Sequence, residues 1–412
     1  MTAAAPTLVC PRCRFSADLG PAFFGCPRCD AQNRLSVLHV HYPDIRVPDV
    51  APFTPRHGTF WDYGPRLPLP DPSFRLSLGE GNTPLVRSHR LAGELAIPEV
   101  YLKNEGANPT GSFKDRYAAV TLSMACAFGF KKVVVSSTGN HGAATAAYAA
   151  AAGLTCLVLG APRMPAAIVE QISRSGALPV IVDGPDRFSL VETLAARHGW
   201  FPAGLFLETR VHNPFGVEAY KTIAYEIVRD LGDVPDAVVF PSARGNGLFG
   251  AWKGFNELME LGVTRRRPRM IACQPTAAAT IERSLAAGSV TRVTPGESVA
   301  VSITEEIADG CAVDAVRLSG GAAVSVDDEA ALGATSALAA DGLWVEVSSG
   351  VAVAGLRRLI EQGRLRDVTR VVVILTGAGI KWCDPAAGRT VARIHGLLEE
   401  LERVLGARGT RL

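Results

Sequence analysis

The sequence carries almost no net charge, and this disfavours two classes of partner. Its 412 residues include 42 lysines and arginines against 40 aspartates and glutamates, which gives a formal net charge of +2. Proteins that bind nucleic acid or an anionic membrane surface usually present a strong basic excess. We therefore expect a small-molecule substrate, with neither nucleic acid nor membrane as a partner.

Long apolar runs are missing as well. No stretch reaches the length that a membrane-spanning helix needs, and the start from Met1 to Val9 lacks a charged region followed by a long apolar one. Hydrophobic residues still make up 48% of the chain, enough to bury large cores in two or three domains. These features predict a cytoplasmic protein.

A disulfide framework is absent too. Five of the nine cysteines are scattered through apolar stretches and are expected to be small buried hydrophobic residues. The other four form two knuckles, Cys10-Pro-Arg-Cys13 and Cys26-Pro-Arg-Cys29, twelve residues apart. This spacing predicts a structural zinc site, because four thiolates leave no open position for a catalytic water. The alternative is a reduced tail without metal.

After a zinc-ribbon-like segment (1–36) and a proline-rich wrapping linker (37–75), apolar runs alternate with amphipathic ones. The strands that we predict are Val133 to Ser137, Leu154 to Leu159, Leu178 to Val182, Ala237 to Phe240, Met270 to Cys273 and Val371 to Leu375. The helices that we predict include Tyr117 to Phe128, Ala143 to Ala151, Ser189 to His198, Gly216 to Leu231 and Glu329 to Asp341. Such alternation predicts an α/β fold with mostly parallel sheets that bind ligands beyond the carboxyl ends of the strands.

The first polar segment at a predicted junction between a strand and a helix runs from Asn108 to Arg116. Lys114 follows a Pro/Gly turn and precedes a helical run, so it should begin a helix. The helix dipole disfavours an ammonium group at that end and lowers its pKa, which suits a lysine that attacks an aldehyde and then moves protons. The simpler interpretation is a surface charge.

Two further segments offer backbone N–H groups to anions. Ser136-Ser-Thr-Gly-Asn-His-Gly142 follows a predicted strand and could hold a carboxylate, or it could be an ordinary helix cap. Ala243-Arg-Gly-Asn-Gly247 could cradle a phosphate at a helix N-terminus, with a nucleotide site as the alternative. Near the C-terminus, Thr376-Gly-Ala-Gly379 places a neutral hydroxyl after the last apolar strand.

Taken in this order, the four segments resemble the fold-type-II pyridoxal-phosphate enzymes (the tryptophan synthase β-like enzymes), and most of all the threonine synthase family. The matching stretches are Leu78 to Leu85, Lys103 to Arg116, Ser137 to Asn140 and Ala251 to Gly254. The cysteine knuckles match an N-terminal extension of many threonine synthases. The resemblance implies a homodimer and two open α/β lobes, a large cofactor-binding lobe (76–120 and 215–412) and a small one (121–214).

Carried over position by position, the resemblance implies that Lys114 is the catalytic lysine and holds the cofactor covalently. Asn140 should bind the phenolic oxygen of the cofactor, and Thr376 should face its ring nitrogen. The residues expected to hold its phosphate are Arg244, Gly245, Asn246, Gly247 and Leu248. The residues expected to contact the substrate are Ser137, Thr138, Gly139, His141 and Arg210.

Three departures from the threonine synthase pattern bear on the substrate. His141-Gly142 follows Asn140 as in serine and threonine dehydratases, and the phosphate loop differs in its first residues. Gly216 stands where those enzymes typically carry an arginine for the substrate's phosphate, a charge that Arg210 and Arg244 could replace. The leading hypothesis is threonine synthesis from O-phosphohomoserine.

Three other functions stay open at this point. They are a serine or threonine ammonia-lyase, a β-replacement enzyme, and a nucleic-acid-binding or scaffold protein on a degenerate enzyme fold.

Overall fold

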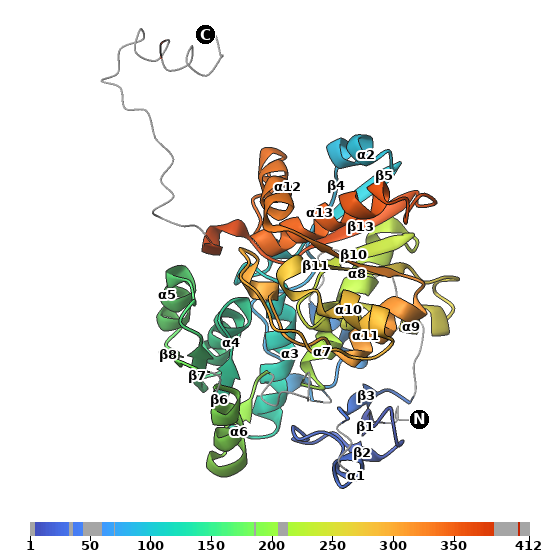
Figure 1. Ribbon diagram of the computed structural model, residues 1–412. Helices are drawn as coiled ribbons and strands as arrows, with labels where there is room; N and C mark the ends of the chain where they lie inside the picture. The colour runs from blue at the N-terminus through green and yellow to red at the C-terminus, as the bar shows by residue number, and fades with distance from the viewer. Residues whose placement is uncertain are drawn as a thin grey trace. The chain divides into compact units, whose positions relative to one another are not determined.

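The computed structural model describes residues 5–32, 36–43, 60–69, 71–184, 187–204, 213–382 and 403 (Figure 1). The chain divides into a large compact unit, Met1–Lys381, and a C-terminal unit, Trp382–Leu412. The large unit contains every element discussed below. In the part of the chain that the structure describes, no helix combines the length and the apolar character needed to cross a membrane.

The N-terminal segment forms a small antiparallel sheet. Its strands β1 (Thr7–Val9), β2 (Ser16–Asp18) and β3 (His39–His41) lie in the order β2-β1-β3, with the short helix α1 (Pro27–Asp30) beside them. Strand β3 lies in the segment expected to be linker, so this sheet extends past residue 36. Further along, the same segment forms 3₁₀ turns at Phe60–Arg66 and Pro72–Phe74.

The larger of the two main sheets has the strand order β12-β11-β10-β13-β5-β4. Its strands are β4 (Leu85–Arg87), β5 (Glu99–Asn104), β10 (Ala237–Pro241), β11 (Arg269–Pro275), β12 (Ala322–Val326) and β13 (Arg370–Leu375). All pairs are parallel except β4 with β5. The predicted α/β class with mostly parallel strands is confirmed. Strands β4, β5 and β12 were not predicted from the sequence.

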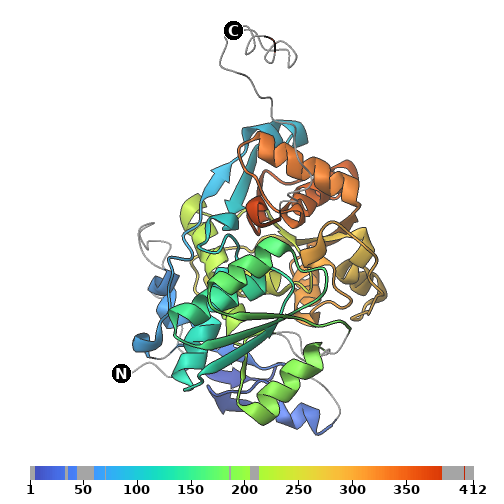
Figure 2. The same cartoon turned by 90° about the vertical axis from the view of Figure 1, so that its left-hand side faces the viewer.

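The second sheet is parallel and has the order β8-β7-β6-β9. Its strands are β6 (Lys132–Ser136), β7 (Thr155–Gly160), β8 (Leu178–Ile181) and β9 (Phe201–Pro202). They all fall within the segment expected to form the small lobe. In Figure 2 this sheet, in teal and green, lies toward the viewer.

Each helical stretch with a predicted range begins and ends within three residues of it. In the described part of the large unit, twelve helices follow α1. They are α2 (His89–Leu95), α3 (Lys114–Ala127), α4 (Asn140–Ala151), α5 (Ala166–Arg174), α6 (Arg187–His198), α7 (Gly216–Ala219), α8 (Lys221–Leu231), α9 (Asn246–Glu260), α10 (Thr280–Ala287), α11 (Gly310–Leu318), α12 (Asp328–Ala340) and α13 (Val347–Glu361). The single helix predicted from Gly216 to Leu231 is interrupted at Tyr220, where the backbone N–H bonds to Val217 three residues back and tightens the turn.

Side chains on the central strands of the large sheet alternate between two cores. On β10, Val238 and Phe240 pack with residues of α8 and α9, whereas Ala237 and Val239 pack with residues of α13. Both faces are therefore covered, which explains why these strands are apolar throughout instead of alternating with polar residues.

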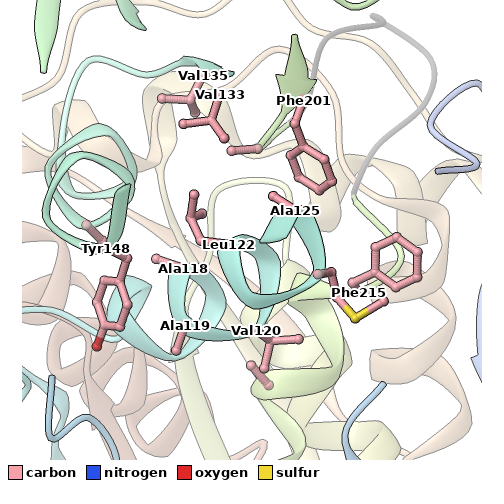
Figure 3. Packing of buried hydrophobic residues seen from close by; sticks show 14 of the residues in the cluster. Ala118, Ala119, Val120, Leu122, Ala125, Val133, Val135, Tyr148, Phe201 and Phe215 are labelled. Carbon is pink, nitrogen blue, oxygen red and sulfur yellow. The ribbon is translucent and has the colours of Figure 1, made fainter. Parts of the chain in front are cut away.

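Helix α3 is buried along almost its whole length and packs against α4 and α7. Figure 3 shows Ala118 and Leu122 of this helix near Val133 and Val135 of β6, with Tyr148 of α4 alongside. Small alanine side chains let the neighbouring elements approach closely. The helix that begins at Lys114 is thus fixed by packing on several sides.

Candidate functional site

The Lys114 loop is held in place by backbone bonds to the end of strand β13. Lys114 is the first residue of α3, as the sequence predicts. The Phe113 N–H donates to the carbonyl of Thr376 at 3.0 Å, and the Ala378 N–H donates to the carbonyl of Gly111 at 2.9 Å. The expected catalytic lysine and the expected partner of the ring nitrogen are therefore brought to one edge of the large sheet, although they lie far apart in sequence.

Burial is the main influence on the Lys114 amine. It lowers the pKa of Lys114 to about 8, against the opposing effect of the negative charges of Glu346 and Glu305. Its Nζ lies 4.6 Å from the ring centre of Phe113 and 5.9 Å from that of Tyr220. The sequence predicts a lowered pKa of Lys114 from the helix dipole; in the structure, the largest cause is the loss of solvent around the amine.

A buried ion network lies directly behind the lysine. Arg116 is fully buried and bonds Glu105 at 2.8 Å and Glu226 at 2.5 Å. Lys103 adds a second cation to Glu226 at 2.7 Å, and Thr83 donates to Glu105 at 2.7 Å. Because each carboxylate is paired, the network ties α3 to strand β5 and helix α8.

Glu346 links the two residues expected to bind the cofactor ring. Asn140 Nδ2 donates to Glu346 Oε2 at 2.7 Å, and the Thr376 hydroxyl donates to Glu346 Oε1 at 3.0 Å. All three side chains are buried. Gly377 makes room for this contact, since a Cβ at that position would lie 2.6 Å from the Glu346 carboxyl carbon. Sequence reasoning missed Glu346, which stands in none of the glycine-rich segments.

The loop from Ser137 to Gly139 joins β6 to α4. The N-cap residue of α4 is Gly139, and the Ser137 Oγ accepts from the Gly142 N–H in the first turn of this helix at 2.9 Å. The Thr138 Oγ1 accepts from the Ala161 N–H at 3.2 Å. The Ser137 hydroxyl is therefore already engaged with the backbone of its own loop.

His141 lies on the first turn of α4 and packs edge-on against the ring of Tyr117, with 4.8 Å between ring centres. Its Nε2 lies 3.2 Å from the carbonyl oxygen of Ala203, so this nitrogen carries the proton and donates. Burial, together with the charge of Lys114, lowers the pKa of His141 to about 3. The imidazole is consequently neutral in the physiological range.

The segment expected to hold the phosphate joins β10 to α9. Gly245 has a φ of +95°, and a Cβ there would lie 2.4 Å from Ala312, so a larger residue is excluded on both grounds. Asn246, Gly247 and Leu248 form the first turn of α9, where backbone N–H groups are not used within the helix. Arg244 is buried and pairs with Glu305 at 3.1 Å.

Arg210 and Gly216 are the two further positions that bear on a site for the substrate's phosphate. Arg210 lies outside the described residues. At Gly216 a Cβ would lie 2.4 Å from the Thr121 hydroxyl and 2.5 Å from the Tyr117 ring. Side chains of α3 thus occupy the space that a Cβ at position 216 would need. An arginine cannot be placed there without moving Tyr117.

The four N-terminal cysteines converge. Their sulfur atoms all lie within 4.8 Å of one another, with Cys10 3.7 Å from Cys29 and Cys13 3.5 Å from Cys26. Four sulfurs bound to one zinc at about 2.3 Å stand about 3.8 Å apart, so the spacing fits a tetrahedral site. The scattered cysteines that the structure describes are free thiols at Cys126, Cys156, Cys273 and Cys311, and Cys383 lies outside the described residues.

The residues present fit the expected cofactor. Asn140 Oδ1 and Arg244 Nη1 are buried and have no hydrogen-bond partner among the described residues, an arrangement that a polar ligand would relieve. The glycine cradle at Gly245 offers helix N–H groups to a phosphate. Lys114 provides the amine for an aldehyde.

Comparison of sequences is consistent with this geometry. Residues 76–377 match the family described as pyridoxal-phosphate dependent enzyme. A threonine synthase of Methanocaldococcus jannaschii is 37% identical over 357 residues, covering 84% of this chain and 86% of that protein. A threonine synthase of Methanosarcina acetivorans is 34% identical over 388 residues, covering 92% of both.

Solved structures with the same fold have other activities. An L-serine ammonia-lyase from Rhizomucor miehei aligns with a TM-score of 0.63 and 21% identity, covering 72% of this chain and 93% of that chain. Maize serine racemase aligns with a TM-score of 0.64 and 18% identity, covering 79% and 93%. At this identity the likeness establishes the fold-type-II architecture alone.

Proposed function

We propose that this chain, which belongs to the pyridoxal-phosphate-dependent enzymes, converts O-phosphohomoserine and water into threonine and inorganic phosphate. The observation that carries the proposal is the similarity to threonine synthases over most of the chain. Support comes from the convergence of Lys114, Asn140 and Thr376 at one edge of the large sheet.

The proposed roles follow from the chemistry of each side chain. When bound, the cofactor supplies an electron-accepting ring that stabilises negative charge at the substrate's Cα. Lys114 takes the Cα proton and returns it, which its lowered pKa favours at neutral pH. Loss of a proton from Cβ expels phosphate from Cγ, a proton is then added at Cγ to form the methyl group, and water adds at Cβ.

The other residues orient and bind. Asn140 would bind the phenolic oxygen of the cofactor, and Thr376 would offer a neutral hydroxyl to its ring nitrogen. Glu346 fixes the directions of both groups. The first-turn N–H groups of α9 and the glycine at 245 hold the phosphate of the cofactor. The loop from Ser137 to Gly139 would receive the carboxylate of the substrate. The Ser137 and Gly139 N–H groups already donate to the Leu159 carbonyl and the Ser137 hydroxyl, so Thr138 is the residue of this loop that would offer a donor.

We also propose that Cys10, Cys13, Cys26 and Cys29 bind one structural zinc ion. The sulfur spacing supports it. A closed set of four thiolates would stabilise the N-terminal sheet and take no part in the reaction. A homodimer and a cytoplasmic location stay predictions of the sequence.

One observation favours a different reaction of the same class. The position that usually carries the phosphate-binding arginine is Gly216, and Tyr117 closes the space around it. A substrate without phosphate, such as threonine or serine, would not need that charge. Such a substrate would give a keto acid and ammonia, the chemistry of an ammonia-lyase.

A single assay decides between the two. The protein saturated with pyridoxal phosphate is incubated separately with O-phosphohomoserine, threonine and serine, and the products are identified by mass. Threonine and phosphate formed from O-phosphohomoserine support the proposal. Keto acid formed from threonine, with O-phosphohomoserine untouched, supports the lyase. Turnover of none of them would point to a β-replacement reaction.

A further inference from the structure

Arg187, which belongs to none of the sequence motifs, reaches the candidate site from the side of the small sheet. It is the first residue of α6, and its Nη1 donates to the Thr138 hydroxyl oxygen at 3.1 Å. Thr138 lies in the loop that is expected to bind the substrate. Since this oxygen also accepts from the Ala161 N–H, the Thr138 hydroxyl can direct its own proton to a ligand.

Arg244 brings a second guanidinium from the large sheet. Its side chain is nine-tenths buried and its Nε donates to Glu305 at 3.1 Å. Its Nη1 is also buried and has no hydrogen-bond partner among the described residues. A buried N–H of a cation without an acceptor is costly, and an anionic ligand would satisfy it.

Electrostatic effects show that these groups share one region. Burial lowers the pKa of Arg187, the negative charges of Glu305 and Glu306 oppose this shift, and the positive charges of Arg163 and Arg244 add to it. Glu305 also raises the pKa of Lys114. Glu305 therefore acts on Lys114, Arg187 and Arg244 alike.

We infer that Arg187 and Arg244 together bind the distal dianionic group of an amino-acid substrate, a phosphate monoester or phosphonate, between the two sheets. Guanidinium groups bind phosphate oxygens through charged, directional hydrogen bonds. The pair supplies the positive charge for which Gly216 has no space. This inference rests on the proposed function only for the identity of the substrate as O-phosphohomoserine.

The same chemistry could serve the phosphate of the cofactor, so the test separates the two sources. The probes are a phosphonate analogue of O-phosphohomoserine, in which CH2 replaces the ester oxygen, and L-norvaline, which has the same chain without the anion. Calorimetry on the holoenzyme measures the affinity for each probe. The affinity for pyridoxal phosphate is measured separately on the apoprotein.

Arg187→Gln should weaken binding of the phosphonate by about ten- to a hundred-fold, as expected for the loss of a charge-assisted contact. Its affinities for L-norvaline and for pyridoxal phosphate should stay within about two-fold of the wild type. Arg187→Lys should recover part of the phosphonate affinity. The matched control is Arg317→Gln, because Arg317 is exposed on α11 and pairs only with Asp314 among the described residues.

Three results for the Arg187→Gln variant would overturn the inference. They are unchanged phosphonate affinity in Arg187→Gln, an equal loss for L-norvaline, and a loss confined to pyridoxal phosphate, which would assign Arg187 to the cofactor. The wild-type protein could bind the phosphonate more tightly than L-norvaline, lose this preference in Arg187→Gln, and still leave O-phosphohomoserine unconverted. That result would refute the proposed function and support the anion site. Wild-type protein with equal affinity for both probes would refute the anion site itself.

Discussion

At the scale of single residues, burial and charge act in opposite directions on the Lys114 amine. Burial lowers its pKa to about 8, while Glu346 and Glu305 raise it. Only the neutral amine attacks an aldehyde. In the apoprotein, the rate of covalent capture of pyridoxal phosphate should therefore rise with pH up to about 8 and then level off. Stopped-flow absorbance measures this; a rate that still rises to pH 10 would contradict it.

Replacement of Glu346 tests how strongly its negative charge raises the pKa of Lys114. Glu346→Gln removes a negative charge that raises the pKa of Lys114, so the midpoint of the capture profile should move to lower pH. The control is Glu361→Gln at the exposed end of α13, which should leave the midpoint in place. A midpoint that is unchanged or higher in Glu346→Gln would show that Glu346 does not act on Lys114.

The position of Lys114 at the start of a helix could be predicted because its motif is local. A lysine after a Pro/Gly turn and glycines after a strand are visible in a few consecutive letters. Glu346 could not be predicted, since its role depends on contacts with Asn140 and Thr376, each brought to it by a different strand. Arg187 was missed for the same reason: its partner Thr138 lies 49 residues away.

At the scale of elements, the buried ion network at the start of α3 holds the Lys114 loop. Arg116→Met would leave Glu105 and Glu226 without their shared cation in a buried setting. Breaking such a pair costs about 3–5 kcal/mol, so the free energy of unfolding should fall by about that much. Urea denaturation measures it, with the exposed Arg317→Met as the control. A loss below about 1 kcal/mol would show that the network contributes little.

Prediction of elements succeeded where burial on both faces makes a strand uniformly apolar, as in β6, β10 and β13. It failed for β5, whose residues include Glu99, Lys103 and Asn104. Lys103 can be buried because Glu226 of α8 pairs with it. The sequence of β5 therefore lacks the uniformly apolar pattern of the other central strands. The break between α7 and α8 was missed because the helical pattern continues through Tyr220.

At the scale of the whole chain, the N-terminal sheet packs on the helix that begins at the phosphate loop. His39 of β3 lies 5.4 Å from Phe249 of α9 between ring centres, and Lys253 donates to the Val40 carbonyl at 3.5 Å. The N-terminal sheet therefore contacts α9 through strand β3.

Metal analysis of protein purified without chelator should find one zinc per chain. Cys10→Ser should lower the melting temperature, because a structural site contributes to folding. Turnover per bound cofactor should persist, since the four cysteines lie in the N-terminal segment. Absence of zinc would remove the assignment, and a folded Cys10→Ser protein without turnover would make the site more than structural.

The central claim is that Lys114 binds the cofactor, and peptide mapping tests it most directly. The wild-type protein, saturated with pyridoxal phosphate, is reduced with borohydride and digested, and the modified lysine is identified by mass spectrometry. A second buried lysine, Lys381, donates to the Thr110 carbonyl at 2.6 Å and is the natural competitor. We predict that the label lies on Lys114 and that Lys114→Ala carries none. A label on Lys381, or a wild-type protein that takes up none, would contradict the account.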